Sequence, residues 1–165
     1  MHEILYRSDT MKLSDIIVPQ AVISQLASTT RDDAVSELIG AMARAGAIAD
    51  DRVEDITGAI LAREAQATTG IGNGVAFPHA RIKGVKKAVG VIGCSSEGIN
   101  FDSLDGQPVN VVLLLLSNAD DADEHLQAME TIFRHVQRQA FCNDLRACCT
   151  QDEIVALVEK ADDVE

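Results

Sequence analysis

One aliphatic run, residues 109–116, constrains the fold more than any other feature of the sequence. Pro108 precedes it, β-branched valines open it, and residues 111–116 contain no polar side chain. A preceding proline and β-branched residues favour a strand over a buried helix. A strand this apolar must be covered on both faces, so helices have to lie on both sides of its sheet. The sequence therefore predicts an α/β sandwich.

Apolar residues at helical spacing predict two helices ahead of this strand. Thr30 is a helix N-cap, and Gly46 ends that helix. A second helix begins at residue 50 or 51, and its last turn carries Arg63 and Glu64. The other elements expected are a strand at 22–26, a loop at 68–74, a strand at 88–94, a helix from about residue 121, a short helix around Leu145 and a last helix that Thr150 and Glu153 open as a capping box.

Composition narrows the function. The formal net charge of −12 repels nucleic acids, and aromatic residues, at 3%, are too few to form stacking platforms for bases. The first ten residues lack the apolar stretch of a secretory signal, and no apolar run is long enough to cross a bilayer. We therefore expect a cytoplasmic protein without membrane insertion. The four cysteines form no CxxC pair and are expected to be reduced thiols.

The chain is expected to form one domain. Its 165 residues are enough for a single hydrophobic core without disulfides or a structural metal. Met11 reads as a second natural beginning of the sequence. We therefore expect a loose extension at residues 1–10, a single domain at 11–160 and a frayed acidic tail at 161–165.

The segment from Arg63 to His79 is the cluster best suited to group-transfer chemistry. It combines a guanidinium, threonines at 68 and 69, glycines at 70, 72 and 74, and a histidine that follows a proline. A neutral imidazole is a nucleophile near pH 7, while backbone N–H groups, hydroxyls and a guanidinium bind phosphoryl oxygens. Phosphoryl transfer asks mainly for positioning and charge stabilisation, so this set would suffice. From the residues alone, a tight turn before an edge strand is the preferred explanation of the glycines.

Other kinds of site fit the segment less well. It is not a P-loop, because no Gly-Lys-Ser/Thr follows the glycines, and its glycine spacing differs from that of a dinucleotide-binding turn. A zinc site from His79, His125 and a cysteine would have no standard ligand spacing. Taken alone, His125 reads as a surface histidine beside acidic residues.

Three further features of the sequence, His135, Glu64 and a group of lysines, can be explained by structure alone. His135 stands among Arg and Gln residues and is expected to be a solvated helix residue. Glu64 is either a salt-bridge partner that fixes Arg63 or an exposed helix end. The lysines at 83, 86 and 87 are an exposed turn before a strand or a contact for a partner.

The sequence around His79 resembles the active-site signature of the enzyme IIA proteins of the bacterial phosphoenolpyruvate:sugar phosphotransferase system, in the fructose/mannitol class. The motif is Arg63-Glu64 followed by Thr-Gly-Ile-Gly-Asn-Gly-Val-Ala-Phe-Pro-His-Ala at residues 69–80. The likeness begins at Met11 and continues to Asp144-Leu145-Arg146. Phe77 is a departure, because an aliphatic residue is common at that position.

The resemblance implies a mixed five-stranded sheet flanked by helices on both sides, and a phosphocarrier that uses no metal or organic cofactor. It identifies His79 as the phosphoryl acceptor, Arg63 as the group that stabilises the phosphoryl group, and His125 as a second histidine that faces the first and orients or donates. The residues that match the wall of the phosphate cleft are Thr69, Gly70, Gly72 and Gly74.

The resemblance also implies partners. An HPr-like carrier would phosphorylate His79, and an enzyme IIB would receive the phosphoryl group, which makes the chain a phosphotransferase. The alternative is a non-catalytic regulatory module whose choice of a transporter or kinase is switched by phosphorylation of His79. We expect a stand-alone A domain, and the sequence resembles the nitrogen-related regulatory enzyme IIA proteins at least as well as the sugar-transporting ones, so both branches stay open.

Overall fold

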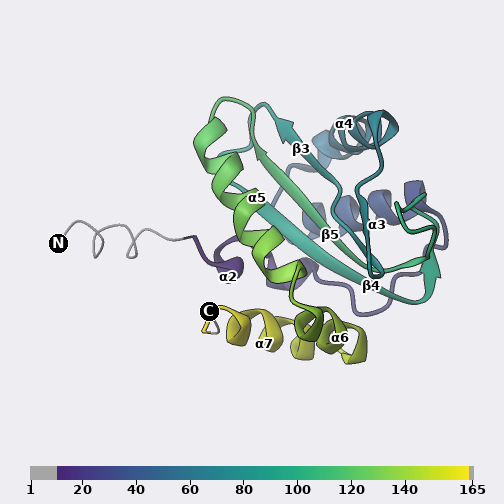
Figure 1. The fold of residues 1–165 in the computed structure, drawn as a ribbon. Coiled ribbons are helices and arrows are strands. Elements are labelled where there is room, and N and C mark those ends of the chain that lie inside the picture. Colours follow the sequence, from purple (N-terminus) through teal and green to yellow (C-terminus); the bar gives the residue numbers. More distant parts are fainter. Residues whose placement is uncertain (1–10, 164–165) are drawn as a thin grey trace.

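Residues 11–163 are described by the computed structural model, in which one five-stranded mixed sheet is covered by helices (Figure 1). The strands are β1 (Gly70–Gly72), β2 (Val75–Ala76), β3 (His79–Ile82), β4 (Val89–Ile99) and β5 (Val109–Asn118). The expected α/β fold with a mixed five-stranded sheet is confirmed.

β5 is the central strand, as its aliphatic sequence predicts. β4 runs antiparallel along one edge of β5. β2 and β3 lie end to end along the other edge, both parallel to β5, and β1 pairs with β2 as a short antiparallel hairpin. The register places Val75 opposite Val111 and His79 opposite Leu115. The strand that begins with His79 therefore lies beside the C-terminal half of β5.

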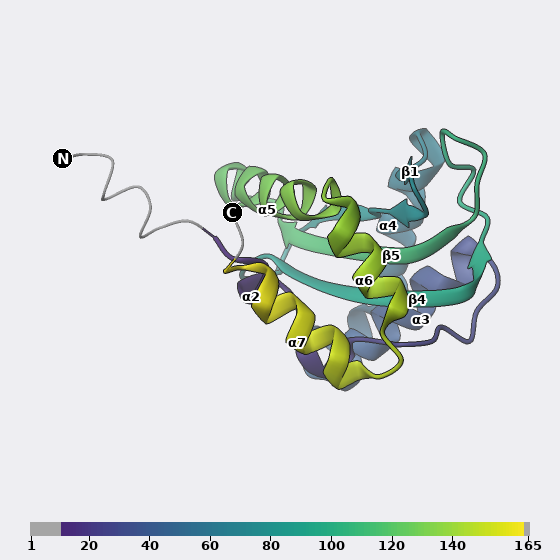
Figure 2. The ribbon, with the colours of Figure 1, turned by 60° about the horizontal axis from the view of Figure 1, so that its bottom comes forward.

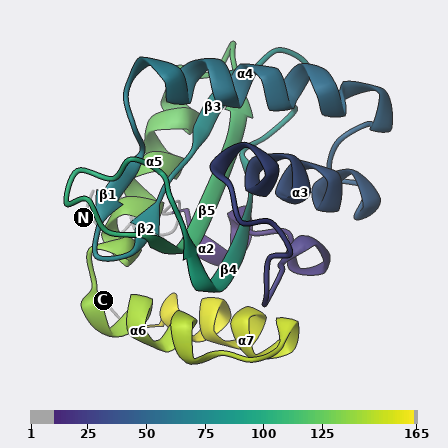
Figure 3. The same ribbon diagram turned by 90° about the vertical axis from the view of Figure 1, so that its right-hand side faces the viewer.

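Alternate residues of β5 enter two separate hydrophobic cores, and the helices divide between the two faces accordingly. Val111 and Leu113 point into one core, and Val112 and Leu114 into the other. The first core is covered by α2 (Leu13–Ile16), α5 (Ala122–Val136), α6 (Gln139–Ala147) and α7 (Gln151–Ala161). The second is covered by α3 (Arg31–Arg44) and α4 (Val53–Gln66). Figure 2 shows α5, α6 and α7 along one face of the sheet, and Figure 3 shows α3 and α4 on the opposite side from α5.

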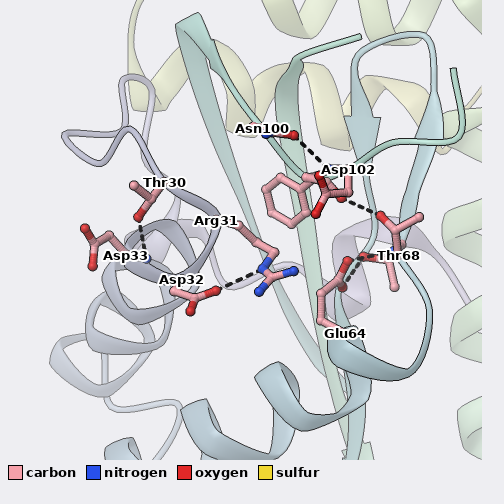
Figure 4. Close-up of polar contacts among 10 residues, drawn as sticks. Thr30, Arg31, Asp32, Asp33, Glu64, Thr68, Asn100 and Asp102 are labelled. Carbon is pink, nitrogen blue, oxygen red and sulfur yellow. Dashed lines mark hydrogen bonds and ion pairs between the residues drawn. The ribbon is translucent and has the colours of Figure 1, made fainter. Parts of the chain in front are cut away.

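The helix boundaries follow their capping residues. The Thr30 hydroxyl accepts a hydrogen bond from the backbone N–H of Asp33 at 3.2 Å and so begins α3 (Figure 4). Gly46, with φ of +80°, follows the end of α3, as a left-handed C-terminal residue should. Thr150 and Glu153 form the expected capping box of α7. Short 3-10 helices, η1 (Pro19–Ala21) and η2 (Asp50–Arg52), precede α3 and α4.

Two local expectations about strands are wrong. Residues 22–26 are not a strand, because they form only one isolated bridge with β4, Ile23 to Gly93, and one further backbone hydrogen bond, from Leu26 to Cys94. Bends at residues 24 and 25 interrupt the segment, so no continuous ladder forms. The expected loop at 68–74 contains β1, whose glycines pair with β2 across a turn at Asn73 and Gly74.

The prediction that His135 is a solvated helix residue is also wrong. His135 is buried rather than solvated, and its Nδ1–H donates to the carbonyl of Thr131 at 2.8 Å. Its Nε2 lies 3.9 Å from a carboxylate oxygen of Asp162, which accepts hydrogen bonds from the backbone N–H groups of Leu13 and Ser14. Asp162 therefore contacts α2 and α5, while Asp163 is exposed, and the frayed tail expected at 161–165 stays a prediction. The predicted extension at 1–10 and the last two positions of the tail, 164–165, lie outside the described residues.

Within residues 11–163, no helix combines the length and the apolar character that crossing a membrane requires.

Candidate active site

His79 is the first residue of β3 and points toward the layer formed by α5. The carbonyl of Pro78 accepts a hydrogen bond from the backbone N–H of Leu115 at 3.0 Å, which fixes the chain beside β5 just ahead of the histidine. Phe77 belongs to the α5-side core, and residues two apart on an extended chain share a face. The rings of Phe77 and His79 are 5.2 Å apart, centre to centre. The histidine that follows a proline in the sequence thus opens a strand.

One hydrogen bond decides which nitrogen of His79 is free to react. Nδ1 lies 2.9 Å from the carbonyl oxygen of Phe77. A carbonyl can only accept, so Nδ1 must carry the proton, and in the neutral ring Nε2 keeps its lone pair. The tautomer of His79 is therefore fixed by the backbone two residues ahead of it.

The surroundings of His79 favour the neutral, nucleophilic ring. Burial of the half-buried side chain lowers its pKa below the ordinary value of 6.5, the bond to Phe77 opposes that change, and the positive charge of Arg63 lowers the pKa further. The carboxylate of Glu64 acts in the opposite sense. The net effect is a ring that is unprotonated near pH 7.

His125, in the first turn of α5, faces His79 across the edge of the sheet. The two ring centres are 6.2 Å apart, with 42° between the ring planes. Nδ1 of His125 is 2.5 Å from the hydroxyl oxygen of Ser117, which is fully buried on β5. Burial lowers the pKa of His125, and the charges of His79 and Arg81 lower it further. The structure thus brings together the two histidines that the resemblance pairs.

Arg63 lies in the last turn of α4, near enough for its charge to act on His79. One of its guanidinium nitrogens donates to the carbonyl of Ala67 at 3.1 Å. No carboxylate lies within ion-pair distance of it among residues 11–163. Since a guanidinium has five N–H donors, most of them remain available to an anion.

Glu64 has neither of the roles expected for it. The side chain is only 3% exposed, so it is not an open helix end, and it does not pair with Arg63. Its carboxylate accepts hydrogen bonds from the hydroxyl and the backbone N–H of Thr69, at 2.6 and 2.8 Å (Figure 4 shows Glu64 beside the neighbouring Thr68). Thr69 in turn accepts, through its carbonyl, the backbone N–H of Phe77. Glu64 and Thr69 therefore hold the backbone just ahead of His79.

Gly72 and Gly74 lie away from the histidine pair. Gly74 accepts the backbone N–H groups of Asn110 and Val111 and contacts the side chain of Arg146. Val111 is four residues before Leu115, the partner of His79, so about 13 Å of strand separates them. Gly72 faces Asp105, and a side chain at Gly70 would collide with the backbone of Ser103. The glycines build a compact hairpin against the 103–110 segment, and of the four cleft residues named from the sequence, Thr69 lies nearest His79 along the sheet.

Sequence reasoning missed two polar residues beside the histidine pair, Arg81 and Ser117. Arg81 lies two residues after His79 on β3, hence on the same face, and it donates to the carbonyl of Ala119 at 2.7 Å. Ser117, its partner in the β3–β5 register, holds His125. Arg81 follows His79 by two residues, a spacing that places both side chains on one face of a strand. The spacing is informative only if residues 79–82 are known to form a strand. Within the described part of the chain, no group of three His, Cys, Asp or Glu side chains has the geometry of a metal site.

Both histidines should titrate below pH 6.5 in an NMR titration of their ring protons, because both pKa values are lowered. Between the lowered values and 6.5 the unfolded chain binds more protons than the folded one, so the free energy of unfolding should fall as the pH drops through that window and be fully retained above it. The substitution His79→Gln should raise the midpoint of His125 by removing a neighbouring positive charge. A midpoint at or above 6.5 for either ring would contradict this electrostatic description.

Comparison with known proteins bears directly on this site. Residues 15–161 match the family described as "Phosphoenolpyruvate-dependent sugar phosphotransferase system, EIIA 2". The chain is 32% identical over 137 residues to a nitrogen regulatory protein of Bradyrhizobium diazoefficiens, a match that covers 83% of this chain and 88% of that protein. It is 28% identical over 152 residues to the fructose-specific EIIABC component of Bacillus subtilis, covering 92% of this chain but only 24% of that much longer protein.

A solved structure agrees with these sequence matches. The nitrogen regulatory protein IIA-Ntr from Neisseria meningitidis superposes with a TM-score of 0.78 at 25% identity, covering 88% of this chain and 98% of that one. The family match spans the sheet, both helical layers and the histidine pair. The chain therefore belongs to the EIIA type 2 family of the phosphoenolpyruvate-dependent sugar phosphotransferase system.

Proposed function

We propose that this chain is a phosphocarrier in which Nε2 of His79 accepts a phosphoryl group from an HPr-like protein. The observation that carries the proposal is the bond from Nδ1–H of His79 to the Phe77 carbonyl, which leaves the Nε2 lone pair free on a half-buried ring. In the transfer, Nε2 forms a bond to phosphorus while the bond from phosphorus to the donor imidazole breaks. Nδ1 keeps its proton throughout, and the Phe77 carbonyl stabilises the positive charge that develops on the ring.

The charged groups near His79 suit the phosphoryl oxygens. Arg63 supplies a guanidinium group near His79, Arg81 supplies one near His125, and His125 supplies a ring N–H. The Ser117 hydroxyl can either donate to or accept from Nδ1 of His125, so His125 can present a proton to an oxygen at its other nitrogen. Charge stabilisation of this kind supplies most of the catalysis in phosphoryl transfer.

The surface beside the histidines supports a protein partner rather than a small substrate. Leu126 and Phe133 on α5 are 59% and 39% exposed, and they lie two helical turns apart on one stripe. The Phe133 ring contacts Phe77, at 6.2 Å between ring centres, and Phe77 contacts His79. Exposed apolar side chains next to a reactive group are typical of a docking surface. The partners proposed are an HPr-like donor and, as acceptor, an enzyme IIB.

A regulatory output is the second candidate function. It is favoured by the 32% identity to a nitrogen regulatory protein over 88% of that protein's length. Phosphorylation adds about 1.5 to 2 negative charges to a chain whose formal net charge is already −12, which would change the set of proteins that it can bind. In this version a transporter or kinase replaces the enzyme IIB, and His79 still accepts the phosphoryl group.

Phosphotransfer from purified components tests the proposal. The chain is incubated with labelled phosphoenolpyruvate, enzyme I and an HPr-like carrier, either of the sugar branch or of the nitrogen branch. The expected product carries an acid-labile, alkali-stable label, as a phosphohistidine does, and the preferred carrier identifies the branch. Rapid transfer of the label to an enzyme IIB supports the relay, whereas a stable label that changes the partner retained in a binding assay supports the regulatory output. An unlabelled chain with both carriers contradicts the proposal.

The substitution Arg63→Ala should slow labelling roughly tenfold, because one cation that faces the transferred phosphoryl group is lost. The melting temperature should stay near that of the wild type, since the Arg63 side chain makes a single hydrogen bond, to Ala67, within the described residues. Arg63→Lys should restore part of the rate by returning the charge without the planar guanidinium. An unchanged rate in Arg63→Ala would leave the residue with no part in transfer.

A further inference from the structure

A second concave site lies on the face of the sheet opposite the histidine pair. A cavity of about 540 Å³ opens between the connection from α3 to α4 and the loop from β3 to β4. Its floor is apolar and includes Ile48, Ile56, Val85 and Val89. Figure 3 shows α3 and α4 side by side on this face, away from α5. The volume is within the range of small-molecule sites, about 300–1,000 Å³.

The cavity is positively charged in a protein that is strongly acidic. Arg52, Lys86 and Lys87 line it, and no Asp or Glu is among its lining residues, although the chain has 26 acidic and 14 basic side chains. Lys86 and Lys87 are exposed, and neither has a carboxylate within ion-pair distance anywhere in residues 11–163. The lysine-rich turn seen in the sequence thus forms one wall of the cavity, and the histidine chemistry does not use it.

Arg52 is held rigidly at the rim of the cavity. It donates to the carbonyl of Lys83 at 2.9 Å and pairs with Asp55 at 3.0 Å. A side chain at Gly84, which has a φ of +90°, would come within 2.9 Å of the guanidinium. These contacts tie the start of α4 to the β3–β4 loop, so the cavity wall is pre-formed. Because Asp55 neutralises the charge of Arg52, Lys86 and Lys87 are the uncompensated positive charges of the cavity.

We propose that this cavity binds a small amphipathic organic anion, whose apolar body covers the floor and whose carboxylate or phosphate faces Lys86 and Lys87. An inorganic anion would leave the floor uncovered, and a neutral apolar molecule would leave the lysines without a counter-ion. The proposal is independent of the phosphocarrier role, because the histidine rings point to the α5 face and neither histidine lines the cavity.

Octanoate is the probe, and 1-octanol, which has the same chain length without the charge, is its control. In a titration of the ¹⁵N-labelled full chain, octanoate should shift the amide resonances of Gly46, Ile48, Gly84 and Val85, and octanol should bind at least about tenfold more weakly. Lys86→Gln/Lys87→Gln should weaken octanoate binding about tenfold. Lys12→Gln/Lys160→Gln removes the same charge elsewhere and should leave binding unchanged.

The apolar floor is tested separately by Ala47→Phe, which should fill the cavity and abolish binding while both lysines remain. The melting temperature of each variant is measured to show that it folds, and His79→Ala should bind octanoate like the wild type. Three outcomes overturn the proposal: equal binding of octanol, equal weakening by the two lysine double variants, or saturation only by an acidic peptide and not by octanoate.

Discussion

Replacement of His79 by alanine should abolish labelling by the phosphorylated HPr-like carrier. The substitution removes Nε2 of His79, the nitrogen that keeps its lone pair on a partly exposed ring because Nδ1 is held by the Phe77 carbonyl. Loss of a nucleophile that forms a covalent intermediate leaves no alternative route, so the rate should fall by at least about 10³-fold, to background. The measurement is incorporation of label from phosphoenolpyruvate through purified carriers.

Two companion variants make this result specific. His79→Gln keeps a polar side chain of similar size and should be equally inactive, which separates loss of the nucleophile from loss of packing against Phe77. His125→Ala should slow labelling but still accept the phosphoryl group, because His125 faces the reactive ring without being the acceptor. If His79→Ala were labelled like the wild type, or if His125→Ala were the variant that lost all label, the assignment of the acceptor would be wrong.

Sequence patterns predicted those parts of the fold whose cause is local. The aliphatic run at 109–116 predicted a central strand covered on both faces, because burial acts directly on each of its residues. Thr30 and Thr150 began their helices where expected, since a side chain that caps a helix binds an N–H only three residues away. The pairing of His79 with His125 came from resemblance, because 46 residues separate them and no local rule joins them.

The errors concern residues whose environment is set by distant parts of the chain. His135 is buried because Asp162, at the far end of α7, folds back beside it and also caps α2. Glu64 is buried because it binds Thr69 across the end of α4, and a helix-terminal glutamate otherwise looks exposed in sequence. The glycines at 72 and 74 have positive φ values in a hairpin packed against Asp105 and Asn110, which agrees with the tight turn preferred from the residues alone, and their place in a phosphate cleft, which the resemblance implies, stays a prediction. A glycine-rich segment in a sequence does not reveal whether its turn binds a ligand or only supports the residues that do.

The double substitution Leu126→Asp/Phe133→Asp should reduce the kcat/KM for labelling by roughly 30-fold, which corresponds to about 2 kcal/mol of lost docking energy. Both side chains are exposed on the α5 stripe that begins beside His125, and Phe133 contacts the core only at the Phe77 ring, so we expect the variant to fold. Two new carboxylates would also have to be desolvated beneath a bound partner. At saturating carrier the labelling rate should recover, because His79, Nδ1–H and the Phe77 carbonyl are untouched.

Leu104→Asp is the matched control for this docking prediction. Leu104 is 80% exposed, but it lies in the loop beside Gly70 rather than on α5, so the same change of an apolar residue to a charged one should leave kcat/KM unchanged. The melting temperature of every variant should stay near that of the wild type, which shows that the fold around the site is intact. A normal kcat/KM in the double variant, or an equal loss of kcat/KM in the Leu104 variant, would place the docking surface elsewhere. A loss confined to the α5 variant would tie recognition of the carrier to the helix that presents His125.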